Sequence, residues 1–105
     1  MKYLNFSADF MEKIKRGEKK ATLRLGIKNY KPGEKVIVRC GEDEIGIAKI
    51  YEVNIKRFRE IDEIDVLLDG YGSKEELKKA LEKFYGKFTE DDMFTQIVFD
   101  LCEIK

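Results

Sequence analysis

Residues 35–58, KVIVRCGEDEIGIAKIYEVNIKRF, carry the pattern that decides the fold. Residues 35–40 alternate apolar and polar side chains as a half-buried strand does, and the segment 41–44 supplies a turn. Residues 45–58 are rich in β-branched side chains and form an unusually long run for one strand, so we expect a bend or bulge within it. A long hairpin is therefore predicted at the centre of the chain.

Helices are predicted on both sides of this hairpin. The segment 73–86 shows the clearest helical pattern, because Ser73 and Glu76 are spaced as a capping box before a stripe of apolar residues. A second helix is expected over 6–17, with a serine cap, and a short helix over 61–70. The apolar positions assigned to the core faces of these helices are Phe10, Met11, Ile14, Ile61, Ile64, Leu67, Leu68, Leu77, Ala80, Leu81 and Phe84.

Two further strands complete the predicted sheet. Residues 20–25 and 93–105 alternate as strands do, and a loop with a Pro-Gly turn at 32–33 leads from the first of them into the hairpin. Few strands over one core, with helices before and after them, indicate the α+β class. A small curved sheet or β-barrel is favoured because it leaves few open edges. We expect residues 1–105 to form a single domain.

The composition excludes several kinds of chemistry. The chain has no His, which excludes Ser–His and Cys–His relays and His-ligated zinc, and it has no phosphate-binding glycine motif. We therefore predict neither a metal nor a cofactor, and we expect Cys40 and Cys102 to be buried, reduced thiols. The sequence has no signal-peptide pattern or membrane-spanning run, so a cytoplasmic location is expected. The charged fraction of 40%, rich in Lys and Glu, favours a thermophilic source.

The formal net charge of zero conceals an uneven distribution of charge along the chain. Residues 1–59 hold 15 Lys and Arg against 8 Asp and Glu, whereas residues 60–105 hold 6 against 13. Such asymmetry indicates a face that binds a polyanion, although folding could equally intermix the two halves into ordinary solvated faces. The basic residues that could contact phosphates are Lys28, Lys31, Arg39, Lys56, Arg57 and Arg59.

The segment 17–26, GEKKATLRLG, contains the first predicted strand and raises the question of function. One face of this strand is apolar and is expected to enter the core. The opposite face places a hydroxyl between two cations, which is either a solvated sheet surface or the wall of a polar site. The apolar face consists of Ala21, Leu23 and Leu25, and the polar face consists of Lys20, Thr22 and Arg24.

Five motifs in this order resemble the ASCH domain, the activating-signal-cointegrator homology family, over nearly the whole chain. They are GEKKATLRL, KPGEKVIV, IGIAKIYEV, LDGYGSKEELKKALEKFYG and TQIVFDL. The resemblance implies a PUA-like β-barrel with flanking helices. It also implies that a cleft between the barrel and the helices binds RNA or a modified nucleoside.

Some small bacterial members of this family are amidohydrolases that remove the acetyl group from N4-acetylcytidine with a Lys, a Thr and a Glu. By this resemblance the Lys corresponds to Lys19 and the Thr to Thr22. The Glu corresponds to Asp69, whose side chain is one methylene shorter. The residues predicted to contact the substrate or RNA are Lys20, Arg24 and Tyr71.

A lysine is the base available to activate a threonine hydroxyl in a chain without His. Burial and neighbouring cations would lower the pKa of Lys19, whereas Asp69 would raise it and hold the ammonium in place. Positions 19 and 22 face opposite sides of a regular strand. The motif therefore requires the chain to be still turning at Lys19; otherwise Lys20 is the functional lysine.

Three functions remain open at the level of the sequence. The first is a module that binds RNA or a nucleoside, and the second is an amidohydrolase that acts on an N4-acylated cytidine. The third is a scaffold that docks partners along an exposed sheet edge. The predicted partner is RNA or a nucleoside and not a membrane, and the sequence does not set the oligomeric state.

Overall fold

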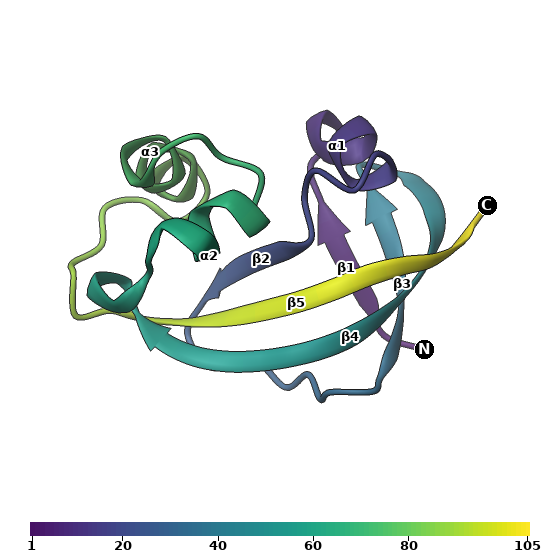
Figure 1. Ribbon diagram of the computed structural model, residues 1–105, viewed down its shortest axis with the longest axis horizontal. Helices are drawn as coiled ribbons and strands as arrows, with labels where there is room; N and C mark the ends of the chain where they lie inside the picture. The colour runs from purple at the N-terminus through teal and green to yellow at the C-terminus, as the bar shows by residue number, and fades with distance from the viewer.

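Five strands form one sheet in the computed structural model, which describes residues 1–105 (Figure 1). Their order across the sheet is β1-β3-β4-β5-β2; β1 pairs with β3 in parallel and all other pairs are antiparallel. The sheet curls into a half-barrel, so the α+β prediction of a small curved barrel with flanking helices is confirmed. The strands are β1 (Tyr3–Phe6), β2 (Ala21–Leu25), β3 (Lys35–Cys40), β4 (Asp43–Arg57) and β5 (Met93–Ile104).

The predicted central hairpin is β3 followed by β4, and β4 also pairs with β5 along most of its length. The expected bend in this segment is present, because the β4–β5 register shifts at Ile47/Ala48 and again at Ile50/Glu52. Gly46 lies where β4 closely approaches the backbone of β5: a Cβ atom there would be 2.0 Å from the carbonyl oxygen of Glu103. Bulges of this kind bend and twist a sheet, which is what closes it towards a barrel.

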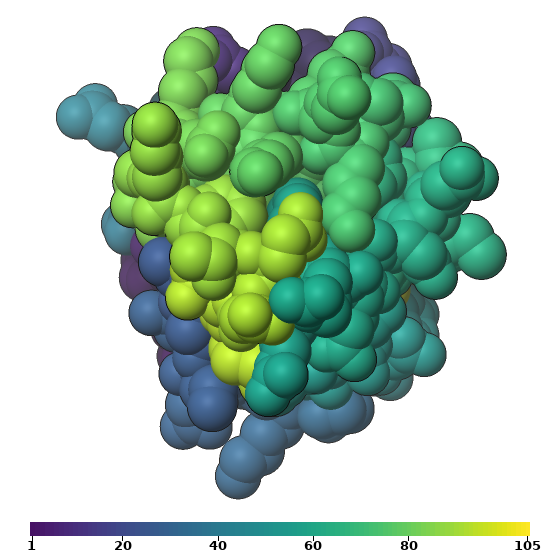
Figure 2. All heavy atoms as spheres, turned by 90° about the vertical axis from the view of Figure 1, so that its left-hand side faces the viewer, coloured from purple at the N-terminus to yellow at the C-terminus, as the bar shows by residue number.

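The helices form two groups on the same side of the sheet (Figure 1). The first group follows β1 directly, and the second lies between β4 and β5 in the chain. Figure 2 shows α3 above the end of the sheet where β4 ends and β5 begins. None of these helices is long and apolar enough to cross a bilayer. The helices are η1 (Ala8–Phe10), α1 (Met11–Lys15), η2 (Phe58–Glu60), α2 (Glu63–Leu68) and α3 (Lys74–Tyr85).

The capping predictions are largely confirmed. Ser7 caps the first helical turn, and the hydroxyl of Ser73 accepts a hydrogen bond of 3.1 Å from the backbone N–H of Glu76. The carboxylate of Glu76 accepts from Gly72 rather than from Ser73, so the return half of the predicted capping box is displaced by one residue. The predicted first helix is shorter than expected, because Phe6 belongs to β1, a four-residue strand too short to show alternation.

Two separate clusters form the core. One is centred on the curled part of the sheet and includes Leu4, Val36 and Ile97, and the other lies under α2 and α3 and includes Phe58, Leu77 and Phe94. The strand β5 passes through both clusters, so its residues 94–97 are all buried and the predicted alternation is lost there. A strand covered on both faces has no solvent side to impose a period of two.

Several residues assigned to the core are exposed instead. Ile64 and Leu67 are 67% and 65% exposed, because α2 turns Asp65 and Val66 inward. Phe84 is 59% exposed although Leu77 and Leu81 on the same stripe are buried. Cys40 is buried as expected, but Cys102 is exposed near the end of β5, beyond the part of the strand that the core covers.

Candidate functional site

A cleft of about 320 Å³ opens between the two helix groups. Its walls come from the end of β1 and η1, from Lys19 and β2, from Asp69 and Tyr71 just after α2, and from α3. The two edge strands approach each other here, since the guanidinium of Arg24 in β2 donates a hydrogen bond of 2.5 Å to the carbonyl oxygen of Asn5 in β1. Five of the six predicted site residues line this cleft: Lys19, Thr22, Arg24, Asp69 and Tyr71.

The chain is still turning when it reaches Lys19, which explains how positions 19 and 22 share one cleft. Gly17 adopts a φ of 74° after α1, and the backbone N–H groups of Glu18 and Lys19 both donate to the carbonyl of Lys13. The strand β2 begins only at Ala21. The alternation rule therefore does not relate the side chains of Lys19 and Thr22, and both reach the cleft.

Lys19 and Asp69 form a buried ion pair at one end of the cleft. Their side chains are only 3% and 4% exposed, and the ammonium also donates to the backbone carbonyl of Asp69 at 3.0 Å. Three aromatic rings surround the same ammonium, with centroids 4.7, 5.5 and 5.8 Å from Nζ. Cation–π contacts of this kind compensate in part for the water that the ammonium has lost. The rings belong to Phe10, Tyr71 and Phe6.

Burial moves both members of this pair towards their neutral forms. Loss of solvent lowers the pKa of Lys19, and Asp69 opposes that shift by its charge and its hydrogen bond. Loss of solvent likewise raises the pKa of Asp69, and Lys19 opposes it. Because desolvation is the larger cause for each group, a proton moves between them at lower cost than between the same groups in water.

Arg24 and Thr22 form a second polar unit on the β2 wall. The guanidinium of Arg24 donates to the hydroxyl oxygen of Thr22 and lies 5.0 Å from the ring centroid of Phe6. Thr22 is only 3% exposed, so its hydroxyl is presented to the cleft and not to bulk water. Asp69 pairs directly with Lys19 and makes no hydrogen bond to Thr22, whose hydroxyl oxygen accepts from Arg24 instead.

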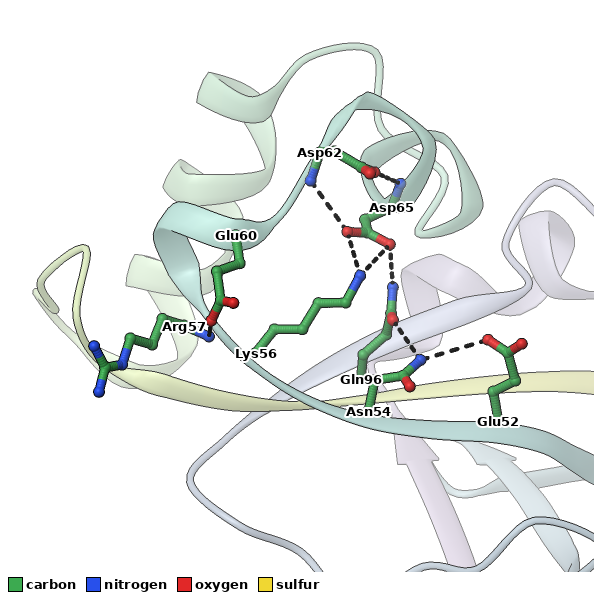
Figure 3. A network of polar contacts seen from close by, with 8 residues as sticks. All are labelled: Glu52, Asn54, Lys56, Arg57, Glu60, Asp62, Asp65 and Gln96. Atoms are coloured by element: carbon green, nitrogen blue, oxygen red, sulfur yellow. Dashed lines mark hydrogen bonds and ion pairs between the residues drawn. The ribbon is translucent and has the colours of Figure 1, made fainter.

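Asp69 is positioned by its backbone hydrogen bond to Asp65, a second buried acidic residue one turn earlier on α2. Asp65 accepts hydrogen bonds from Lys56 of β4 at 2.9 and 3.1 Å and from Gln96 of β5 at 2.7 Å (Figure 3). It also completes a capping box with Asp62 at the start of α2 (Figure 3). The carbonyl of Asp65 in turn accepts the N–H of Asp69 at 3.1 Å, so this network fixes where Asp69 enters the cleft.

Lys20 is the one predicted site residue that the structure does not bring into the cleft. Its side chain is exposed and lies on a different hollow, beside Phe99 and Asp100 of β5. Its backbone links Leu68 and Phe99, which places it between α2 and the sheet. Lys19 therefore lies in the cleft and Lys20 does not, and the assignment of Lys19 as the functional lysine stays a prediction.

Other lining residues escaped the sequence analysis. Phe10 and Phe84 were assigned only to the core faces of their helices, and Phe6 and Tyr85 were given no role in the site. A signal for Phe84 and Tyr85 is their adjacency, since neighbouring residues of a helix point about 100° apart and one of the two rings therefore lies towards the edge of the apolar face.

Much of the basic surface is engaged within the protein. Lys56 pairs with the buried Asp65, Arg59 pairs with Asp91 at 2.6 Å, and the Arg39 guanidinium lies 4.1 Å from the ring centroid of Tyr3. These three residues have partners within the protein, and a phosphate-binding face stays a prediction. The described chain also contains no cluster of three or more side chains of the kinds that ligate metals.

The curled half-barrel with its flanking helices matches the fold of solved ASCH domain structures. The chain belongs to the ASCH domain family, whose family model matches residues 2–103. An ASCH domain from Lactobacillus crispatus JV V101 superposes with a TM-score of 0.74 at 20% identity, covering 97% of this chain and 80% of that one.

Two further solved structures are similar in fold. A protein from Enterococcus faecalis V583 has a TM-score of 0.75 at 16% identity, over 100% of this chain and 83% of that chain. ASCH from Zymomonas mobilis has a TM-score of 0.71 at 13% identity, over 97% and 68%. No curated protein matches the sequence at a significant level.

Proposed function

We propose that the cleft binds a nucleoside, either free or as one residue of an RNA strand. The observation that carries this proposal is the convergence of Lys19, Thr22, Arg24, Asp69 and Tyr71 on one cleft from two separate parts of the chain. A cleft of about 320 Å³ lies at the small end of ligand sites in proteins, which suits one nucleoside and not an extended ligand.

The chemistry of the walls also suits a nucleobase. Part of the lining is apolar and includes aromatic rings of α3, and another part carries the hydroxyl of Thr22 and the guanidinium of Arg24. A base offers an apolar face together with carbonyl and amino groups along its edge, and both kinds of surface find partners here. The cleft contains two cations against one carboxylate, so it is also able to accept an anionic group.

Titration calorimetry with cytidine, at low and at high salt, tests this proposal. We expect saturable binding of the nucleoside that changes little with salt, because a single nucleoside releases no counterions. A parallel filter-binding titration with a short single-stranded RNA shows whether phosphates contribute, through a loss of affinity as salt rises. The absence of binding to nucleoside and RNA at low salt would overturn the proposal.

A second candidate function is amide hydrolysis of an N4-acylated cytidine, and the state of Lys19 favours it. A lysine whose pKa is lowered by burial is able to act as a base, and Thr22 lies in the same cleft. In this proposal the Thr22 oxygen attacks the acetyl carbonyl carbon while its proton passes to the neutral amine of Lys19. Arg24 donates hydrogen bonds to the oxyanion that develops on the carbonyl oxygen.

The remaining steps return the enzyme to its starting state. The carbon–nitrogen bond breaks, and N4 of cytosine leaves with the proton held by Lys19. Water then hydrolyses the acetyl ester of Thr22, releasing acetate and restoring the hydroxyl. In this scheme Asp69 is a positioning residue that holds Lys19 and exchanges a proton with it.

Chromatography of N4-acetylcytidine incubated with the protein tests the second candidate. We expect cytidine and acetate to form with the wild-type protein and with Thr22→Ser, and not with Thr22→Val, which keeps the shape of the side chain but has no hydroxyl. Turnover by Thr22→Val equal to that of the wild type would exclude threonine as the nucleophile. Nucleoside binding without any turnover would leave the first function and remove the second.

A further inference from the structure

The last turn of α3 leaves an apolar stripe without a partner. Leu77 and Leu81 on this stripe are buried, yet Phe84, one turn further along, is 59% exposed. All three line the cleft, so the ring of Phe84 is exposed at the cleft and not on a remote surface. The stripe therefore continues beyond the core and ends in open space beside the candidate site.

The ring of Phe84 is supported from behind by other aromatic rings. Its centroid lies 6.5 Å from that of Tyr85, and Tyr85 in turn lies 6.4 Å from Phe94 in an edge-on arrangement. Phe94 is fully buried in the second core cluster. This chain of rings connects the exposed aromatic surface to the core.

Another part of the cleft lining presents the groups that a planar ring would meet at its edge. Arg24 and Thr22 line the same cleft as Phe84 and Tyr85. The guanidinium is fixed by Thr22 and by the Asn5 carbonyl. Hydrogen bonds thus position the guanidinium of Arg24, and ring contacts connect Phe84 to the core.

We propose that Phe84 is the stacking surface for the base, and that Arg24 and Thr22 contact the edge of the same base. This inference rests on the proposed binding of a nucleoside and assigns the role of each wall. Stacking on Phe84 accepts any base, because every base has a π face, whereas contacts to the edge discriminate between bases. Affinity and base preference therefore come from different walls of the cleft.

The test compares binding of cytidine and adenosine to Phe84→Ala, Phe84→Tyr, Phe84→Leu and a control, Leu67→Ala. Leu67 is a matched control because it is 65% exposed, lies on the neighbouring helix α2 and does not line the cleft. We expect Phe84→Ala to weaken both nucleosides by roughly 5- to 150-fold, the range for the loss of one stacked base. Phe84→Tyr should bind within about twofold of the wild type, and Leu67→Ala should bind unchanged.

Nuclear magnetic resonance measures a chemical-shift change that stacking on an aromatic ring causes and a simple apolar contact does not. A ring stacked on the base shifts the H5 and H6 protons of bound cytidine upfield, and this shift should disappear in Phe84→Leu even though an apolar side chain remains. Equal binding by Phe84→Leu and the wild type, or equal losses in Phe84→Ala and Leu67→Ala, would overturn the stacking role. If the wild type binds no nucleoside, both the stacking proposal and the proposed nucleoside binding fail. If substitutions of Arg24 and Thr22 weaken binding but those of Phe84 do not, the stacking proposal alone fails.

Discussion

The ammonium of Lys19 and the carboxylate of Asp69 lie 50 residues apart in the sequence and form an ion pair with side chains only 3% and 4% exposed. The pair joins the segment before β2 to the end of α2, which are two walls of the cleft. A buried pair is weak evidence for stability, because desolvation offsets the attraction of its charges. Removal of one partner destabilises the folded protein strongly, because it leaves the other charge buried and unpaired.

Asp69→Asn should therefore destabilise the protein by about 3–5 kcal/mol, measured as the free energy of unfolding in urea. The control is Asp91→Asn, which breaks the exposed pair between Arg59 and Asp91 and should cost less than about 1 kcal/mol. The double variant Lys19→Met/Asp69→Leu should recover much of the loss, because no charge remains buried. Equal costs for Asp69→Asn and Asp91→Asn would show that the pair is open to water in solution.

Asp65 should make the stability of the protein sensitive to acid. Burial raises the pKa of its carboxyl, but hydrogen bonds from Lys56, Gln96 and the Asp62 N–H outweigh burial and leave the pKa lowered. A lowered pKa stabilises the folded state above the unfolded value of about 4, and this contribution is lost as the pH falls through the folded value.

Asp65→Asn should accordingly lower the melting temperature at pH 7, and the gap from the wild type should narrow below about pH 4. Loss of the charged partner of Lys56 corresponds to roughly 1–3 kcal/mol at neutral pH. Thermal unfolding followed by circular dichroism from pH 7 to pH 2 measures this gap. A gap that stays constant over the whole range would contradict the assignment.

Tyr71 should make the stability of the folded protein depend on pH under alkaline conditions. Burial, with a smaller effect of Asp69, raises the pKa of its phenol from 10.0 to about 12. A raised pKa contributes stability below the unfolded value of about 10, and that contribution is lost as the pH rises towards 12. Tyrosinate absorbance should therefore show one of the 5 tyrosines titrating near pH 12. Tyr71→Phe should remove this late step, whereas the control Tyr51→Phe, at an exposed site on β4, should retain it.

Gly46 should be the least replaceable glycine of the sheet. A Cβ atom there would lie 2.0 Å from the Glu103 carbonyl oxygen, which is backbone and cannot move aside. Gly26→Ala is the matched control, because Gly26 has a φ of +87° but no atom within 4 Å of an added Cβ. We expect about 1–2 kcal/mol of backbone strain for Gly26→Ala, and at least a further 1–3 kcal/mol of overlap for Gly46→Ala, in urea unfolding. Similar losses for the two variants would mean that β4 and β5 separate at this bulge.

Local patterns in the sequence predict the elements of this fold well, because capping residues, turn residues and alternation act over a few neighbours. Ser73, Gly17 and the alternation of β3 are examples. The pairing of β1 with β3 is not visible in this way, because it joins residues more than 30 positions apart through a strand of only 4 residues.

In the candidate site, too, the sequence predicts some residues, whereas others depend on contacts between distant parts of the chain. The resemblance to the ASCH family selects Lys19, Thr22 and Asp69, and the structure brings them to one cleft. Alternation alone selects Lys20, because it assumes that the strand has already begun at residue 19. The exposure of Phe84 depends on where the core ends beneath α3, which no local pattern reports.

Substitutions of the two neighbouring lysines, Lys19 and Lys20, should have clearly different effects on the affinity for cytidine. Lys20→Met should leave the dissociation constant for cytidine within about twofold of the wild type, because the side chain is exposed and faces another hollow. Lys19→Met should weaken binding by at least about tenfold, because it leaves the Asp69 charge unpaired in the wall of the cleft. Calorimetric titration of both variants with cytidine gives the comparison directly.

A fall in binding by Lys19→Met also has a trivial explanation, which is loss of the fold. The double variant Lys19→Met/Asp69→Leu removes this ambiguity, because it contains no unpaired charge and should unfold at a higher urea concentration than Lys19→Met. If the double variant is folded and still binds cytidine poorly, the lysine is required in the cleft itself. If it binds cytidine as well as the wild type does, the pair serves the fold alone, and the polar contacts to the ligand come from Arg24 and Thr22.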